Sequence, residues 1–395
     1  MLFKKKKPQK TVLLFSIESG IVRAGIILQS PKHPPNLIFE THCTIAFQTD
    51  TSFPRLLVSL KEALVAVCEK IIHEGIVHIA HAKITERSFD EIWCTYGSPW
   101  YISETKKVSH TAEKDFIVTH DSINMLIKEH IEEILREYGG AGEGDTGIII
   151  EQNVINIELN GYTAPNPFGK ETREISMTLF VSIMSEAFKT LIEDVLSRHF
   201  SSDRILHHSM PLMLFSGIRD VLAADDNFLI IDVSTEVTDI STISKDIITG
   251  VISFPVGTGY FVRALSETHN LLPQEGEGLL RLENTRVMPE SQKNAIESVI
   301  SDWKVSFENS LSTLSRGIVP HSIFLLVDEK YQKLILEAIS REQFAQNSRT
   351  LKPFTVTLLS GKLLSPFCLK SGGAVNGDPV LMLAAIYIDK IWAAI

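Results

Sequence analysis

Two short segments of the chain carry acidic and hydroxyl side chains at spacings that suit phosphate chemistry. The first, IIDVSTEVTDIS at residues 230–241, is an apolar run that ends at Asp232, a turn, and a second run that begins at Thr238 and Asp239. In a phosphate-binding hairpin the backbone N–H groups of the turn close on phosphate oxygens. Glycines normally permit that close approach, but here the turn at 234–236 reads STE. The segment therefore predicts a nucleotide site, a degraded nucleotide site or a simple hairpin.

A second segment near the start of the chain, LLFSIESGIVRAGII at residues 13–27, has the same layout. Its turn includes Gly20, and Arg23 follows three residues later. Two such hairpins that face each other across a cleft would hold a triphosphate and its magnesium ion. If the site is active, Asp232 and Asp239 would order magnesium and the attacking water, and Arg23 would contact the phosphates.

No other motif in the sequence predicts a catalytic or metal site. GEGDTG at 142–147 has the spacing of a dinucleotide loop, but it follows an expected helix and its two carboxylates would repel a pyrophosphate. It is interpreted as a loop. The histidines are scattered, with His207 and His208 as the one adjacent pair, and no metal site is expected. The four cysteines lie far apart, as is typical of reduced thiols: Cys43, Cys68, Cys94 and Cys368.

Charge and hydropathy narrow the classes of partner. A net charge of −10 over 395 residues argues against broad nucleic-acid binding. The exception is MLFKKKKPQK at 1–10, which we interpret as a solvated tail, with contact between anionic lipid and Lys4–Lys7 as the alternative. The apolar stretch that follows is interrupted by Glu18, Gly20 and Arg23, so it predicts neither a signal peptide nor a membrane span.

Hydrophobic periodicity predicts two α/β halves, each beginning with strand–turn–strand. Between them a helix–strand–strand–helix pattern over residues 100–200 predicts a small α+β insert, and residues 258–315 are expected to be helical and polar. The last seventeen residues predict a helix docked on the core. The better-defined expectations are strands at 92–96, 228–233, 238–243 and 247–254 and helices at 55–73, 121–138 and 185–200.

One strand of the insert makes a specific packing prediction. The segment NVINIELN alternates strictly, with Ile155, Ile157 and Leu159 on one face. We expect these three side chains to be buried against the helix that carries Ile127 and Ile134.

On these motifs the chain resembles the actin-like ATPase superfamily, and within it the bacterial FtsA and PilM group. The superfamily's first hairpin reads Asp-x-Gly-x-x-x-x-Lys, and Ser16–Arg23 stands there in this chain. Its second reads Asp-x-Gly-Gly-Gly-x-Thr-Asp, and Asp232–Asp239 stands there. The segment FPVGTGYFVRAL, which includes Gly257, resembles the strand and helix that follow. NGYTAPNPFGKETREISMTLFV is similar to the FtsA insert, and MLFKKKK resembles PilM openings.

The resemblance implies an α/β, two-lobed actin-like fold of the ribonuclease H-like kind, with an FtsA-type α+β insert in the first lobe. The implied divisions are a basic tail at 1–10, the first lobe at 11–96, the insert at 97–200, the end of the first lobe and the start of the second at 201–257, a helical insertion at 258–320, and the remainder of the second lobe at 321–395.

The resemblance also implies a nucleotide site with departures that weaken it. Ser16 replaces the first Asp, and Glu18 and Glu236 place carboxylates where phosphates belong. Two unit charges about 4 Å apart repel by about 4 kcal/mol at an effective dielectric constant of 20. The adenosine loop, Leu-Thr-Gly-Gly in the family, departs at Leu326–Asp328. We predict that ATP and magnesium bind weakly or not at all, and that the chain is no enzyme. The implied binding positions are Gly20, Arg23, Asp232, Ser234, Thr235, Thr238 and Gly257.

Three hypotheses on function follow from the resemblance. The first is an FtsA-like scaffold at the cytoplasmic face of the membrane, which would bind the tubulin-like protein FtsZ and form filaments. FtsA-type chains carry an amphipathic anchor beyond the core, and this sequence stops at Ile395, which counts against that role. The second is a PilM-like scaffold of type IV pilus assembly, which would bind a peptide of an inner-membrane component. The third is an active ATPase. An α/β protein unrelated to the superfamily is a further alternative.

Overall fold

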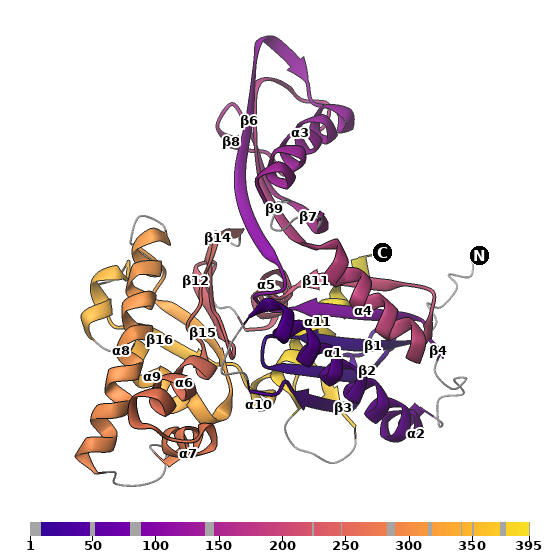
Figure 1. Ribbon diagram of the computed structural model, residues 1–395. Coiled ribbons are helices and arrows are strands. Elements are labelled where there is room, and N and C mark those ends of the chain that lie inside the picture. Colours follow the sequence, from indigo (N-terminus) through magenta and orange to yellow (C-terminus); the bar gives the residue numbers. More distant parts are fainter. Residues whose placement is uncertain are drawn as a thin grey trace.

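The computed structural model describes residues 9–394, apart from 48–51, 80–87, 139–145, 223–224, 283–288, 315–317 and 372–376 and the single residues 246, 341 and 350. Two lobes stand side by side, and a narrower insert projects from the first of them (Figure 1). None of the helices in the described part of the chain is long and apolar enough to cross a membrane.

The first lobe is built on a six-stranded sheet with the order β11-β5-β1-β2-β3-β17. β1 and β2 form the predicted hairpin, and β5 lies parallel to β1 on its other side. The prediction of a strand at 92–96 is confirmed within one residue by β5. The strands are β1 (Lys10–Ile17), β2 (Ile21–Gln29), β3 (Asn36–Thr44), β5 (Glu91–Tyr96), β11 (Ile205–Ser209) and β17 (Leu369–Lys370).

Helices cover both faces of this sheet. Side chains of β1 that point to one face, such as Leu13 and Phe15, pack with α1 (Phe53–Lys70) and α4 (Glu186–His199). Their neighbours on the other face, Val12 and Leu14, pack with α5 (Met210–Val221) and α11 (Pro379–Ala394). The near-continuous apolar character of β1 follows from this burial on both faces.

The second lobe has a five-stranded sheet with the order β14-β13-β12-β15-β16. Its strands are β12 (Phe228–Val233), β13 (Thr238–Ser244), β14 (Ile247–Phe254), β15 (Ser322–Val327) and β16 (Thr355–Leu358). One face packs around the fully buried Trp303 against α6 (Thr258–His269), α8 (Glu290–Thr313) and α9 (Gln332–Ile339). α7 (Pro273–Leu282) lies against α6. The other face, with Ile230 and Phe324, joins the cluster around α5 and α11, so the lobes share one core.

The insert has its own sheet, with the order β6-β9-β7-β8, and one helix (Figure 1). Its elements are β6 (Ile102–Ile117), α3 (His120–Tyr138), β7 (Gly147–Leu159), β8 (Tyr162–Thr163) and β9 (Glu171–Ser185). The packing of Ile157 and Leu159 with Ile127 and Ile134 is confirmed. The expectation for Ile155 is wrong: the register of β7 shifts between Val154 and Asn156, and this side chain packs in the core shared by the lobes.

The end of the chain differs from the expected layout. We expected residues 321–395 to continue the second lobe, but β17 pairs with β3 of the first lobe and α11 packs against α5 and β1. Likewise α4, expected at the end of the insert, packs against α1 of the first lobe. The place of both helices depends on long-range contacts that local periodicity does not encode.

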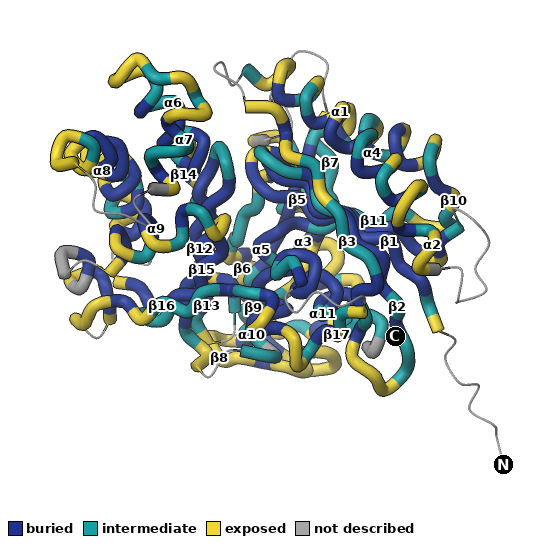
Figure 2. The backbone as a smooth tube through the Cα atoms, turned by 90° about the horizontal axis from the view of Figure 1, so that it is seen from below, coloured by how far each residue is buried: buried dark blue, intermediate teal, exposed yellow. Residues whose placement is uncertain are grey.

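Short elements complete the chain. β4 (Ser88–Phe89) pairs with β10 (Ser201–Ser202), and a π-helical turn η1 (Ile71–Gly75) joins α1 to α2 (Ile76–Ile79). The 3-10 segments η4 (Glu329–Tyr331) and η5 (Glu342–Asn347) flank α9, and α10 (Gly361–Leu364) precedes β17. Most residues of the two central sheets are buried (Figure 2).

Candidate functional site

The turns of the two predicted hairpins face each other across the interlobe boundary, as the sequence predicted. The hydroxyl oxygens of Ser19 and Ser234 lie 3.2 Å apart. The backbone N–H of Glu236 donates to Ser19 Oγ over 3.1 Å. A Cβ atom added at Gly20 would overlap Thr235 Oγ1. The two turns are therefore in direct contact through side chains.

Each turn uses its own backbone groups to close the hairpin. In the first, the N–H of Glu18 donates to the carbonyl of Ile21 over 3.0 Å. In the second, the N–H of Ser234 donates to the carbonyl of Val237 over 3.0 Å, and Ser234 Oγ donates to the same oxygen over 2.8 Å. These bonds fix the turns in register with the last strand pairs of β1–β2 and β12–β13.

The N-terminus of α6 caps the second turn. The N–H groups of Thr258 and Gly259 donate to the carbonyls of Ser234 and Thr235 over 3.0 and 2.8 Å. Gly257 allows this approach, because a Cβ there would overlap the carbonyl oxygen of Ser234. The first N–H groups of a helix have no partner within it and commonly bind anions. Here protein carbonyls satisfy two of them.

Thr238 contributes to packing behind the turn. Its hydroxyl donates to the carbonyl of Val256 over 2.7 Å and accepts from the indole N–H of Trp303 over 3.0 Å. The hydroxyl hydrogen and one of its two lone pairs are therefore directed into the second lobe.

Arg23 lies between two carboxylates. It forms a buried ion pair with Glu18 through its Nη1 atom, and its Nε donates to Asp378 Oδ2 over 2.8 Å. Ser16 Oγ donates to Glu18 Oε1 over 3.0 Å. Burial acts to lower the pKa of Arg23, but Glu18 and then Asp378 outweigh it, so that the pKa lies above its ordinary value. The guanidinium is thus held in an internal ion-pair network.

Asp232 and Asp239 are both buried at the boundary between the lobes. Within the described residues, Asp232 Oδ2 has no hydrogen-bond partner. Burial, followed by the charges of Glu18 and Asp239, raises its pKa well above the ordinary value. Asp239 accepts from Ser98 Oγ over 2.8 Å and from Ser253 Oγ over 2.5 Å. Burial raises the pKa of Asp239 as well, and these hydroxyls partly oppose the shift.

Glu236 turns away from the first hairpin. Its two carboxylate oxygens accept from Arg263 of α6 over 3.0 and 2.5 Å, in a bidentate pair. The ring of Phe47, from the loop after β3, lies 5.8 Å from the Arg263 guanidinium carbon. Arg263 therefore compensates the negative charge that we expected Glu236 to place in the phosphate position.

The loop expected to hold adenosine begins where β15 ends at Val327, next to Val233 of β12. Asp328 caps the short helix that follows, since its Oδ1 accepts from the N–H of Lys330 over 3.0 Å. This carboxylate thus has a local structural role.

The histidine pair lies in β11, away from the hairpins. His207 bonds to the Tyr96 hydroxyl over 2.7 Å and to Glu193 over 2.9 Å, while His208 bonds to Glu151 over 2.8 Å. The tail at 1–8, with Lys4–Lys7, and most of the GEGDTG loop lie outside the described residues.

Sequence reasoning missed four groups at the interlobe boundary: Ser98, Ser253, Arg263 and Asp378. Ser98, Arg263 and Asp378 lie far along the chain from the residues that they contact, whereas Ser253 stands opposite Asp239 on the next strand. The glycines at 257 and 259 beside the second turn were the one signal in the sequence of close packing there.

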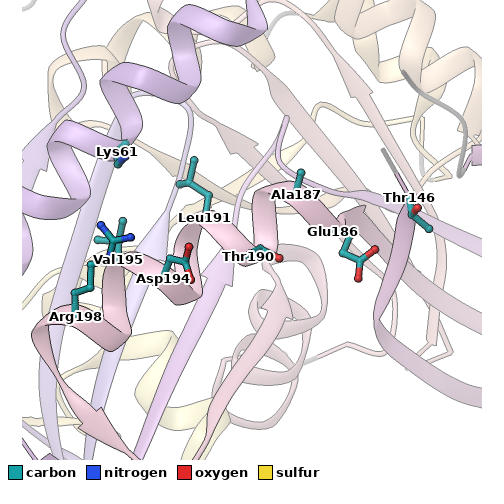
Figure 3. A pocket seen from close by; sticks show the side chains of 9 residues that line it. All are labelled: Lys61, Thr146, Glu186, Ala187, Thr190, Leu191, Asp194, Val195 and Arg198. Carbon is teal, nitrogen blue, oxygen red and sulfur yellow. The ribbon is translucent and has the colours of Figure 1, made fainter. Parts of the chain in front are cut away.

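A surface pocket of about 550 Å³ lies where the insert joins the first lobe (Figure 3). It follows α4 and is bounded by Lys61 of α1 and by Thr146, the residue before β7. The walls combine aliphatic side chains with charges of both signs: Lys61, Thr146, Glu186, Ala187, Thr190, Leu191, Asp194, Val195 and Arg198.

Comparison with known proteins shows a likeness in structure alone. No protein-family model and no curated protein matches the sequence. A chain of the PilM–PilN type IV pilus biogenesis complex superposes with a TM-score of 0.64 at 11% identity, over 97% of this chain and 99% of that one. At this identity the likeness shows the fold.

Two further solved structures are less similar. A Bacteroides thetaiotaomicron protein of actin-like ATPase fold and unknown function gives a TM-score of 0.41 at 11% identity, over 91% and 93% of the two chains. EutJ, an ethanolamine utilization protein of Carboxydothermus hydrogenoformans, gives 0.45 at 8% identity, over 97% and 90%.

Proposed function

We propose that this chain, which has the two-lobed actin-like fold, is a protein-binding scaffold of the PilM kind whose interlobe cleft does not use ATP. The observation that carries the proposal is the contact of Thr235 with Gly20, together with the hydrogen bond between Ser19 and Glu236. These contacts lie between the two turns, where a bound triphosphate would need the turns to stand apart.

The residues at the boundary do not fit a triphosphate. The N–H groups of Glu236, Thr258 and Gly259 already have protein acceptors, so a phosphate would have to displace them. The carboxyl groups of Glu18, Asp232 and Asp239 are buried there. Arg23 is committed to Glu18 and Asp378. A triphosphate would therefore meet carboxyl groups, and N–H groups that already have protein acceptors, rather than free N–H groups and cations.

The pocket in Figure 3 is suited to a segment of a partner protein. Leu191 and Val195 supply apolar surface, Lys61 and Arg198 supply cations, and Asp194 supplies an anion. A surface of mixed sign next to aliphatic side chains matches a polypeptide better than a phosphate ligand. One structural neighbour is a chain of the PilM–PilN type IV pilus biogenesis complex, which supports a pilus inner-membrane component as the partner.

An FtsA-like role in division, with FtsZ as partner and assembly into filaments, is the second candidate. A separate four-stranded insert beside the first lobe is the observation that favours it. In either role we place the chain at the cytoplasmic face of the membrane, where Lys4–Lys7 would reach anionic lipid when the tail is free. Neighbouring genes for pilus ATPases or for division proteins would distinguish the two.

An active ATPase is favoured by one feature: Asp232 Oδ2 has no hydrogen-bond partner in the described part of the chain, and a magnesium-bound water would satisfy it. Titration calorimetry with Mg-ATP separates this alternative from the scaffold. We expect no binding heat and an unchanged melting temperature, whereas a ligand at 100 times its Kd would stabilise the fold by about 2.7 kcal/mol. A clear rise in melting temperature, or phosphate release abolished by Asp232→Ala, would overturn the proposal.

The partner site is tested with cytoplasmic peptides of the membrane proteins encoded beside this chain. Thr190→Arg, in the pocket, should abolish capture of the partner peptide. Thr313→Arg, at the exposed end of α8 in the second lobe, is the matched control and should leave capture intact. Equal capture by both variants would move the partner away from this pocket.

A further inference from the structure

A second cavity, of about 570 Å³, lies at another edge of the first lobe. We call it the proline pocket. Its wall combines the turn between β2 and β3 with the segment after α10, the end of α5 and the last turns of α11. The lining residues are Ser30, Pro31, Lys32, His33, Pro34, Pro35, Val221, Pro366, Phe367, Ile386, Asp389 and Trp392.

The chemistry of the proline pocket favours an apolar ligand that also carries a cation. Proline rings, Phe367, Ile386 and Trp392 offer apolar and aromatic surface. Asp389 adds one carboxyl group, and burial raises its pKa above the ordinary value. Among the described residues no cation offsets that shift, although Lys32 and His33 also line the pocket. A half-buried carboxylate in apolar surroundings is stabilised by a cation brought to it.

The start of the chain leaves the sheet beside this pocket. Lys10, at the beginning of β1, pairs with Gln29 at the end of β2. The next residue after Gln29 is Ser30, which lines the proline pocket. Figures 1 and 2 both show the end of α11 on the same side of the first lobe as the start of β1. Residues 1–8 precede the described chain and, fully extended, span about 27 Å at most.

We propose that residues 1–8, MLFKKKKP, dock in the proline pocket of their own chain. Leu2 and Phe3 supply the apolar part, and a lysine that follows them supplies the cation for Asp389. Lys32 and His33 disfavour a purely basic ligand, so the apolar pair is needed for binding. The docked tail is unavailable to anionic lipid, so the pocket and a membrane surface compete for the same lysines. The inference is independent of whether the cleft binds ATP.

The test uses the chain without residues 1–8 and the synthetic peptide MLFKKKKP carrying a fluorophore, with anisotropy as the readout. The deletion ends before β1 and leaves the described fold intact. The peptide should bind the shortened chain and bind the full chain at least tenfold more weakly, because the full chain fills its own pocket. Equal binding to both chains, or binding to neither, overturns the proposal.

Substitutions in the pocket and in the peptide test whether the proline pocket is the binding site. In the shortened chain, Asp389→Asn should weaken peptide binding about five- to tenfold, as expected for loss of one charge-assisted contact. Asp203→Asn, at an exposed position of the first lobe, is the matched control and should leave binding unchanged. A peptide with Leu2 and Phe3 replaced by serine should also bind weakly. If Asp389→Asn or the serine peptide binds as well as its parent, the pocket is not the site.

A vesicle measurement distinguishes lipid from intrachain docking. With phosphatidylserine vesicles, the full chain carrying Asp389→Asn should bind more tightly than the full wild-type chain, since its tail is released. Identical vesicle binding of the two chains would show that the tail is not held by the pocket and would contradict the proposal.

Discussion

The boundary between the lobes and the joint between the insert and the first lobe both bury carboxyl groups, but among the described residues Glu151 at the joint has hydrogen-bond donors on both of its oxygens, whereas Asp232 at the boundary does not. At the joint, Glu151 of β7 accepts from Ser209 Oγ over 2.5 Å and from His208 over 2.8 Å. In the cleft, Asp232 Oδ2 lacks a partner within the described residues and the pKa of Asp232 is raised. A buried carboxylate with partners holds a structure together, whereas one without them costs stability.

The joint is constructed by a local irregularity in a strand. The register of β7 against β9 shifts between Ile149 and Glu151, which directs the Glu151 side chain into the first lobe. The ring of His208 stacks on Trp93 at 4.6 Å, and the Tyr387 hydroxyl lies 3.2 Å from His208 Nδ1. One carboxylate thereby connects the insert, β11 and α11. The comparison indicates that Glu151 acts as a structural clamp at the joint, whereas the fold does not need the carboxylate of Asp232.

The largest expected effect breaks the clamp. Glu151→Ala leaves His208 and Ser209 without their acceptor in a buried position, so we expect a loss of about 3 kcal/mol in the free energy of unfolding. Urea unfolding followed by tryptophan fluorescence measures it. Asp232→Ala is the matched change in the cleft and should cost far less. If the two variants lose equal stability, the contrast between the regions is wrong.

The second prediction concerns the contact between the hairpin turns. Gly20→Ala places a methyl group against Thr235 Oγ1 and should destabilise the protein by about 2 kcal/mol. Thr235→Ala would leave the Cβ atom 2.4 Å from the added methyl group, so Thr235→Gly is the compensating change and should restore about 1–2 kcal/mol in the double variant, a coupling typical of residues in contact. A double-mutant cycle in urea measures the coupling. Additive effects would mean that the turns do not touch in solution.

The third prediction uses pH. The pKa of Asp232 is raised in the folded protein, so the folded state binds more protons than the unfolded state at pH values between about 4, the unfolded value, and the folded pKa. Stability attributable to this group therefore falls as pH rises through that window.

Asp232→Asn removes the penalty without changing shape. We expect it to stabilise the protein by about 1–2 kcal/mol at pH 8, with the difference vanishing near pH 4. Melting temperatures of both proteins over this range test it, with the exposed Asp203→Asn as control. A variant that is less stable at pH 8 would show that ionised Asp232 has a partner.

The sequence predicted elements whose signal is local and missed groups that meet only in the fold. β12 and β14 begin and end where predicted, because each is an apolar run bounded by polar turns. β11, with five residues that include two histidines, carries no such signal. The facing of the hairpins followed from the resemblance, but the pairing of Glu236 with Arg263 joins residues 27 positions apart on different elements. The register shift that directs the Glu151 side chain is likewise set by the pairing of β7 with β9. The alternation of apolar and polar residues in the sequence does not indicate where this shift occurs.

The smallest expected effect sharpens the comparison within the cleft itself. Glu236 is the acid of the second turn that has a full partner, and its side chain and that of Arg263 are 13% and 15% exposed. Glu236→Gln keeps the shape but removes the charge, so we expect a loss of about 1 kcal/mol, the range of a partly buried charge-assisted bond. Arg263→Gln should cost a similar amount, and the double variant should cost less than the sum, because each single change leaves the partner's charge uncompensated. Chemical unfolding at low and high salt measures it, and the loss should shrink only modestly with salt, since the pair is largely shielded from solvent. If Glu236→Gln instead stabilises the protein, as we expect for Asp232→Asn, then neither acid of the second hairpin is compensated. The contrast between a carboxylate with partners and one without them would then hold between the joint and the interlobe boundary, but not within the boundary itself.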